Sequence, residues 1–137
     1  SGILGGRNNT ISQRSDSFII GSNLSATANC TTFMNSGSFD GYVDVVGDVT
    51  AANFVLSSDE SLKESIQDLD IIVDAKWKSY KFKDSNELRY GVIAQELEET
   101  NPELIRANDR GLKSVAYIDL LIAKIAELEA RLDKAGL

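Results

Sequence analysis

Ser58 and Lys63 are the two residues of this chain whose types and spacing can support chemistry without histidine. The sequence contains no histidine, which excludes Ser-His-Asp catalysis, histidine-ligated zinc and histidine pH switching within the chain. A serine hydroxyl can attack a carbonyl carbon while a neutral lysine amine accepts the hydroxyl proton. A lysine can act as that base only where burial or nearby positive charge keeps its amine neutral. The pair therefore indicates acyl transfer by a serine nucleophile.

The same segment also fits the start of a helix, which would involve no chemistry. Ser57, Ser58 and Asp59 are all residue types that favour the N-cap, and Ser57 with Glu60 fits a capping box. Residues five apart do not share a face of a regular helix. Lys63 therefore reaches Ser58 only through an irregular first turn, or acts on the Ser58 of a neighbouring chain. The spacing alone leaves these interpretations open.

Composition limits the classes of partner that the chain can bind. The 137 residues are 42% hydrophobic and carry a formal net charge of -7, which argues against a nucleic-acid groove or an anionic membrane surface. No apolar run approaches the ~18 residues of a membrane span. Cys30 is the single cysteine, so no intrachain disulfide is possible, and we expect it to be a small buried residue. We expect no metal and no cofactor.

The first part of the chain is repetitive. Residues 1–56 are rich in Gly, Ser, Thr and Asn, and Ile-Leu-Gly-Gly at 3–6 is echoed sixteen positions later by Ile-Ile-Gly-Ser at 19–22, then more loosely at 33–36. Such units bury a core only by stacking on one another or on partner chains. Disorder is the alternative for so polar a composition. We predict a β-structured stalk over residues 1–57.

Two further extended pieces are predicted before the composition changes near residue 56. Residues 42–49 indicate a strand, a turn and a second strand, and residues 53–56 indicate another short extended segment.

The second part has the rhythm of an α+β domain. A short helix is predicted over 59–69, with Leu62, Ile66 and Leu69 on one face. Further predictions are a strand over 77–82, a strand leading into a helix over 89–97, and two strands paired around a turn at 108–111.

A heptad seam marks the end of the chain. The predicted helix spans about 116–134, and its apolar residues recur at spacings of three and four: Ile118, Leu121, Ile125, Leu128 and Leu132. Because the seam covers only about two heptads, an isolated coiled coil would be marginal. The helix packs either on partner helices from other copies, which the N-terminal repeats also favour, or on its own domain.

Several motifs resemble, in the same order, those of the endosialidase-type intramolecular chaperone domain, the peptidase S74 family. Residues 56–66 (Leu-Ser-Ser-Asp-Glu-Ser-Leu-Lys-Glu-Ser-Ile) resemble its opening, and the resemblance extends to about residue 132. Further matches are the aromatic strand at 77–80, a counterpart of the Gly-Phe-Ile-Ala-Gln-Glu-Val signature at 90–99, a Pro-Glu-Leu segment at 101–105, and the approach to the terminal helix at 113–117.

The resemblance implies a self-cleaving serine peptidase that acts once. In this family the domain sits at the C-terminus of phage tail fibres, tail spikes and neck appendages, trimerises the upstream β-fibre and is then cut off. Ser58 would be the nucleophile, Lys63 its assistant and Asp59 the residue that orients the turn, with cleavage between Ser57 and Ser58. Some members carry a histidine near the signature that affects processing, and Tyr90 stands at that place here.

The implied architecture is mixed. Residues 1–57 would form an all-β stalk resembling a trimeric β-helix or β-prism, and residues 58–137 an α+β chaperone whose terminal helix joins a trimeric bundle. The homotrimer would belong to a virion, and the chaperone part would be released in the host cytoplasm. Two alternatives stay open: a structural trimer tip without catalysis, and a tip that binds a host receptor or glycan through side chains such as Phe39 and Tyr42.

Overall fold

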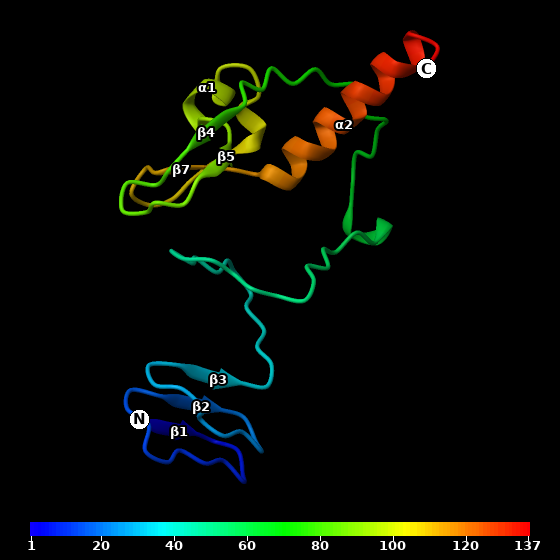
Figure 1. Ribbon diagram of the computed structural model, residues 1–137. Helices are drawn as coiled ribbons and strands as arrows, with labels where there is room; N and C mark the ends of the chain where they lie inside the picture. The colour runs from blue at the N-terminus through cyan, green and yellow to red at the C-terminus, as the bar shows by residue number, and fades with distance from the viewer. The chain divides into compact units, whose positions relative to one another are not determined.

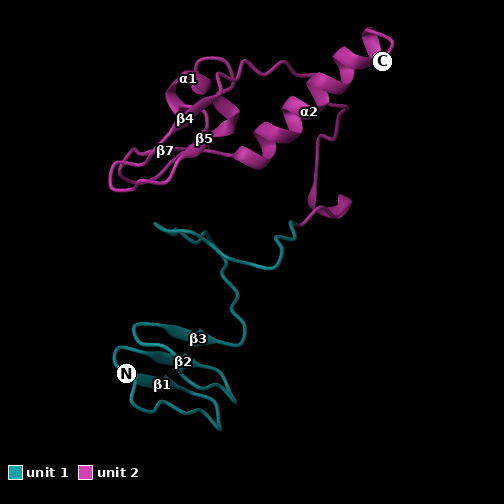
Figure 2. Cartoon of the chain, viewed as in Figure 1, with its two compact units in different colours: residues 1–56 teal, residues 57–137 magenta.

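The computed structural model describes residues 1–137 and divides into two compact units (Figure 2), residues 1–56 and residues 57–137. The chain is a small mixed α/β protein with short strands and a long C-terminal helix. Each unit has its own arrangement of elements and is described by itself.

The first unit contains three parallel strands stacked side by side (Figure 1): β1 (Gly2–Leu4), β2 (Phe18–Ile20) and β3 (Thr32–Met34). In this register Ile3 lies beside Ile19, and Ile19 lies beside Phe33. The echo in the sequence is therefore the register of the stack, and the prediction that these units stack is confirmed. Ile19, in the middle strand, is fully buried.

Asparagines in the turns hold successive layers of this stack together. Asn8 and Asn23 both adopt left-handed backbone conformations, with φ of 57° and 59°, which asparagine tolerates better than most residues. Asn8 Nδ2 donates to Asn23 Oδ1 over 3.1 Å, and Asn9 Nδ2 donates to the Gly21 carbonyl over 2.6 Å. The polar composition thus serves the turns, and the interpretation of these layers as disordered is wrong.

Two predictions for the first unit, the strands over 42–49 and the burial of Cys30, are wrong. Residues 42–49 contain no strand, and residues 53–56 join no sheet. A short extended segment needs an edge to pair with, and this chain provides none there, so Val46 and Val55 are exposed. Cys30 is also exposed, because it occupies a turn with φ of 54° rather than a core position.

The second unit contains two antiparallel strand pairs and two helices. β4 (Lys78–Tyr80) pairs with β5 (Arg89–Gly91), and β6 (Ile105–Ala107) pairs with β7 (Lys113–Val115). The chain passes from β5 into α1 (Ala94–Glu98), then through the 3₁₀ turn η2 (Pro102–Leu104), and ends with α2 (Tyr117–Lys134). These elements confirm the predicted strand, strand-to-helix passage, hairpin and terminal helix.

The core of the second unit lies beneath α2. It consists of six buried residues drawn from four segments: Val73, Val92, Leu97, Leu104, Leu120 and Ala123. The helix contributes Leu120 and Ala123, whereas the seam residues Ile118, Leu121, Ile125, Leu128 and Leu132 are 44–56% exposed. One face of α2 thus packs on its own domain and a second apolar face has no partner within the chain.

The helix predicted over 59–69 is wrong. Only the 3₁₀ turn η1 (Glu60–Leu62) forms, and Lys63 already has extended backbone angles. Leu62, Ile66 and Leu69 are 53–72% exposed. A short helix forms stably only when its apolar face packs on another surface, and the chain offers none to these side chains.

Candidate functional site

Lys63 and Ser58 lie in direct contact. The Lys63 Nζ donates a hydrogen bond to the Ser58 Oγ over 2.7 Å, and both residues are exposed. The contact arises from η1, in which the Leu62 amide donates to the Asp59 carbonyl and the Lys63 amide to the Glu60 carbonyl. A 3₁₀ turn is tighter than an α-helical one, and after it the chain is extended. This irregular turn brings side chains five residues apart together within one chain.

Asp59 fixes the turn that brings them together. Its Oδ1 accepts hydrogen bonds from the Ser61 hydroxyl over 2.6 Å and from the Ser61 amide over 2.9 Å. These bonds, the hydroxyl first, hold the pKa of Asp59 below its usual value because both favour the carboxylate. Asp59 is therefore the N-cap, and the interpretation of Ser57 or Ser58 as the cap is wrong. The Ser58 hydroxyl instead accepts from Lys63.

The arrangement places a hydroxyl and an amine beside one peptide bond. Ser58 Oγ belongs to the residue that follows the Ser57 carbonyl, so an attack on that carbon closes a five-membered ring. Such a serine with an adjacent lysine is a known form of activated nucleophile. The chain contains no group of three or more His, Cys, Asp or Glu side chains placed to hold a metal ion. None of its helices combines the length and apolar character needed to span a membrane.

Tyr90, at the place where some family members carry histidine, lies on β5. It is 76% exposed and pairs with Ser79 of β4. Its neighbour Gly91 is buried, and a Cβ there would lie 2.1 Å from the Tyr117 hydroxyl. The Tyr117 hydroxyl accepts from the Val92 amide over 3.0 Å. The glycine of this motif is therefore required by the close approach of α2.

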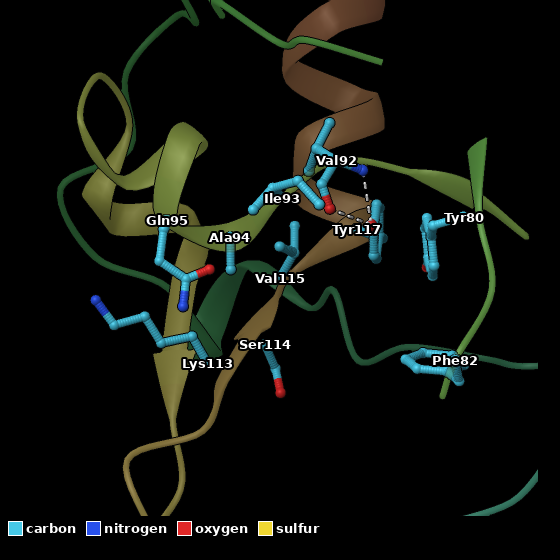
Figure 3. Close-up of a pocket in the computed structure, with 10 residues that line it drawn as sticks. All are labelled: Tyr80, Phe82, Val92, Ile93, Ala94, Gln95, Lys113, Ser114, Val115 and Tyr117. Carbon is cyan, nitrogen blue, oxygen red and sulfur yellow. Dashed lines mark hydrogen bonds between the residues drawn. The ribbon is translucent and has the colours of Figure 1, made fainter. Parts of the chain in front are cut away.

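A cavity of about 430 Å³ lies beside this contact. Figure 3 shows Tyr80 and Phe82 on one side of it and Val115 and Lys113 on the other, with Tyr117 hydrogen-bonded to Val92. No feature of the sequence marked this hollow, because it is formed by residues from β4, the link between β5 and α1, α1, β7 and the start of α2, which are far apart along the chain.

Sequence reasoning also missed a cluster that holds residues 71–75 against α2. Lys124 and Glu127 form an ion pair of 2.8 Å, and both contact the backbone of Val73. The spacing of three between Lys124 and Glu127 was the available signal, but it does not identify the distant backbone that they bind.

Comparison with known proteins finds one family whose model matches a stretch that includes the motif. Residues 58–106 match the family model of peptidase S74, described as the chaperone of endosialidase. No curated protein and no solved structure matches the chain. The matched stretch begins at Ser58 itself and continues through β4, β5, α1 and η2 into β6. Residues 58–106 of this chain are therefore similar to the peptidase S74 family of endosialidase chaperones.

Proposed function

We propose that this chain is an intramolecular chaperone that trimerises and folds a fibre or spike, then releases itself by cleaving its own Ser57–Ser58 bond. The family points to a chaperone role. The observation that carries the cleavage is the 2.7 Å contact between Lys63 Nζ and Ser58 Oγ at the first residue of the matched stretch. On this proposal the fibre stays in the virion and residues 58–137 leave it in the host cytoplasm.

The reaction begins with an N-to-O acyl shift. Ser58 Oγ bonds to the carbonyl carbon of Ser57 and gives its proton to the neutral amine of Lys63. The bond between that carbon and the Ser58 nitrogen then breaks, and the nitrogen takes the proton from Lys63. The product is an ester that joins Ser57 to the Ser58 side chain.

Water completes the cleavage. A water oxygen adds to the ester carbon, and the bond from this carbon to Ser58 Oγ breaks. One proton of the water passes to Ser58 Oγ, and the other is released to solvent as the carboxylate forms. Ser57 becomes a C-terminal carboxylate, while Ser58 becomes a new N-terminus with a free amine and hydroxyl. One water molecule is consumed and Lys63 returns to its starting state, so the reaction needs no cofactor.

Assembly supplies what the single chain lacks. Ser58 and Lys63 are both exposed in the chain, whereas a lysine base requires a desolvated or positively charged environment. The seam of α2 presents five apolar side chains, each about half exposed, that fit partner helices. Three copies joined there would cover the motif and enable cleavage only after assembly.

The order of events has a physical rationale. An intertwined β-fibre is rich in contacts distant in sequence, and such folds form slowly. A helical trimeriser raises the effective concentration of the three chains. Once the trimeriser has been removed, an unfolded fibre could not refold, so the assembled fibre is kinetically trapped.

Mass spectrometry of the freshly expressed chain tests the proposal. Wild-type chain should yield one fragment that ends at Ser57 and one that begins at Ser58, and Ser58→Ala should remain intact. Ser57→Ala is the matched control, because it retains both the nucleophile and a carbonyl to attack, and it should still be cut. An intact mass after long incubation of the wild-type trimer would contradict self-cleavage and favour a structural tip.

Mixed trimers decide whether Lys63 acts within its own chain. The contact observed within one chain predicts that mixing Ser58→Ala chains with Lys63→Ala chains restores no cleavage. Restored cutting would show that the lysine of one copy serves the serine of another.

A further inference from the structure

Residues 71–75 form an extended strap that packs on the domain without joining a sheet. Their burial alternates: Ile71 and Ala75 are half-buried and pack against the core, Val73 is 2% exposed, and Ile72 between them is 79% exposed. This alternation is that of a β-strand with one buried face. These residues belong to no sheet, so the hydrogen bonds of their backbone must come from elsewhere.

Side chains supply those hydrogen bonds. Lys124 Nζ donates to the Val73 carbonyl over 3.1 Å, and the Val73 amide donates to Glu127 Oε2 over 3.4 Å. Asn101, which is 5% exposed, donates from Nδ2 to the Ile72 carbonyl over 3.5 Å. The side chains of Lys124 and Glu127 are only 22% and 11% exposed. We call Lys124, Glu127 and the Val73 backbone the Val73 clamp.

The clamp depends on a folded helix. Lys124 and Glu127 are three residues apart, so only helical backbone places them as neighbours on one face. Lys124 donates to the Val73 carbonyl and Glu127 accepts from the Val73 amide. The pair thus provides Val73 with the same two hydrogen bonds that a neighbouring β-strand would provide. Because the strap lies more than 50 residues before its partners, the clamp closes only after α2 has formed and docked.

We propose that the Val73 clamp positions the cleavage motif and ties cutting to the folding of α2. This inference rests on the proposed self-cleavage. Val73 lies ten positions after Lys63, and a flexible chain of that length has an end-to-end distance of roughly 18 Å. The strap thus keeps the exposed motif close to the helix that carries the trimer seam, where partner copies would exclude water from Lys63. An unclamped motif would sample bulk solvent and react more slowly.

Hydrogen exchange in the full chain tests the clamp directly, with Ser58→Ala as the background so that nothing is cut. The double variant Lys124→Met with Glu127→Gln should speed exchange of the Val73 amide about tenfold, while amides in the rest of α2 and the trimer mass stay unchanged. The matched control is Lys134→Met with Glu129→Gln, two exposed charges on the same helix, which should exchange as the background does. Unchanged protection at Val73 would overturn the clamp.

Cleavage rates of chains with Ser58 intact then test positioning. The clamp variant should be cut about tenfold more slowly than the control variant. An equal rate after protection at Val73 has been lost would overturn the positioning role. If wild-type chain is never cut, the proposed function and the positioning role both fail, while hydrogen exchange still decides whether the clamp exists.

A second variant leaves the clamp and the core untouched. Inserting ten Gly and Ser residues between the exposed Gln67 and Asp68 doubles the tether. Effective concentration falls as about the −3/2 power of tether length, so cleavage should slow about threefold. A rate equal to that of wild type would overturn the positioning role even if the clamp variant failed to fold.

Discussion

Two lysines show how differently the Ser58–Lys63 motif and the body of the second unit are built. Lys63 contacts Ser58 five residues away, and both are in water. Lys124 contacts Glu127 and the carbonyl of Val73, 51 residues away, and its side chain is largely buried. The geometry of the motif is local and its surroundings are aqueous, whereas the geometry of the clamp is long-range and its surroundings are the core. Acyl transfer needs a lysine that contacts the serine, as Lys63 does, and that is shielded from water, as Lys124 is.

Replacing Lys63 should produce the largest effect, because it tests whether the exposed contact carries the chemistry. Lys63→Met should slow cleavage of assembled trimer by about 100-fold or more, the contribution typical of a general base. Lys63→Arg keeps the charge but cannot lose its proton, and should be equally slow. The rate is followed as the fraction of cut chain over time by mass spectrometry. Substantial activity in Lys63→Arg would show that the lysine acts through its charge and not as a base.

The next test compares the buried and the exposed apolar faces of α2 in the second unit. Leu120 is fully buried and Leu121 is 50% exposed. Leu120→Ala should lower the free energy of unfolding by about 3 kcal/mol, as large-to-small core substitutions do. Leu121→Ala should leave hydrogen exchange of the core amides unchanged and shift the chain from trimer toward monomer. Urea unfolding, hydrogen exchange and sedimentation measure these effects. Equal loss of core protection in both variants would mean that the exposed face also stabilises the single domain.

Asp59 tests whether the turn alone sets the contact between Ser58 and Lys63. Asp59→Ala removes the acceptor for Ser61 and should slow cleavage about fivefold, in line with the loss of an N-cap. Asp59→Asn keeps an acceptor oxygen and should cut at close to the wild-type rate. The same time course measures both. If the two variants slow equally, then the charge of Asp59 matters and its role as a cap does not explain the site.

The sequence predicted those elements whose partner surfaces lie in the same chain. The Ile-rich echo gave the register of the parallel stack, since Ile3, Ile19 and Phe33 lie side by side. The turn at 108–111 lies between two strands that pair with each other, and both were predicted. In each case local pattern and tertiary contact agree.

Predictions failed where an apolar pattern had no partner within the chain. Leu62, Ile66 and Leu69 have the spacing of a helix face, yet residues 63–69 form no helix and the three side chains are exposed. Periodicity records that a face is apolar, but it does not supply the surface that buries it. The sequence did not predict the Val73 clamp, because no repeating pattern marks it. Its partners are single residues more than 50 positions apart. At the site, residue types and spacing suggested the pair, but only the observed 3₁₀ turn brings it into contact.

The smallest expected effect is the pH dependence of stability that Glu127 contributes, which tests the clamp without involving the Ser58–Lys63 motif. Lys124 holds the pKa of the Glu127 carboxyl below its usual range through a hydrogen bond, aided by the Val73 amide and the positive charge of Arg131. A carboxyl with a lowered pKa stabilises the folded chain at pH values above its unfolded pKa of about 4.3, and this contribution is lost as pH falls through the folded value. Wild-type chain should therefore lose more thermal stability than Glu127→Gln between pH 6 and about pH 3. Glu129→Gln removes an exposed carboxylate from the same helix and controls for net charge. Parallel melting curves for wild type and Glu127→Gln would mean that the carboxylate does not hold the strap, and the contrast between a buried clamp and an exposed motif would then rest on the packing of Val73 alone.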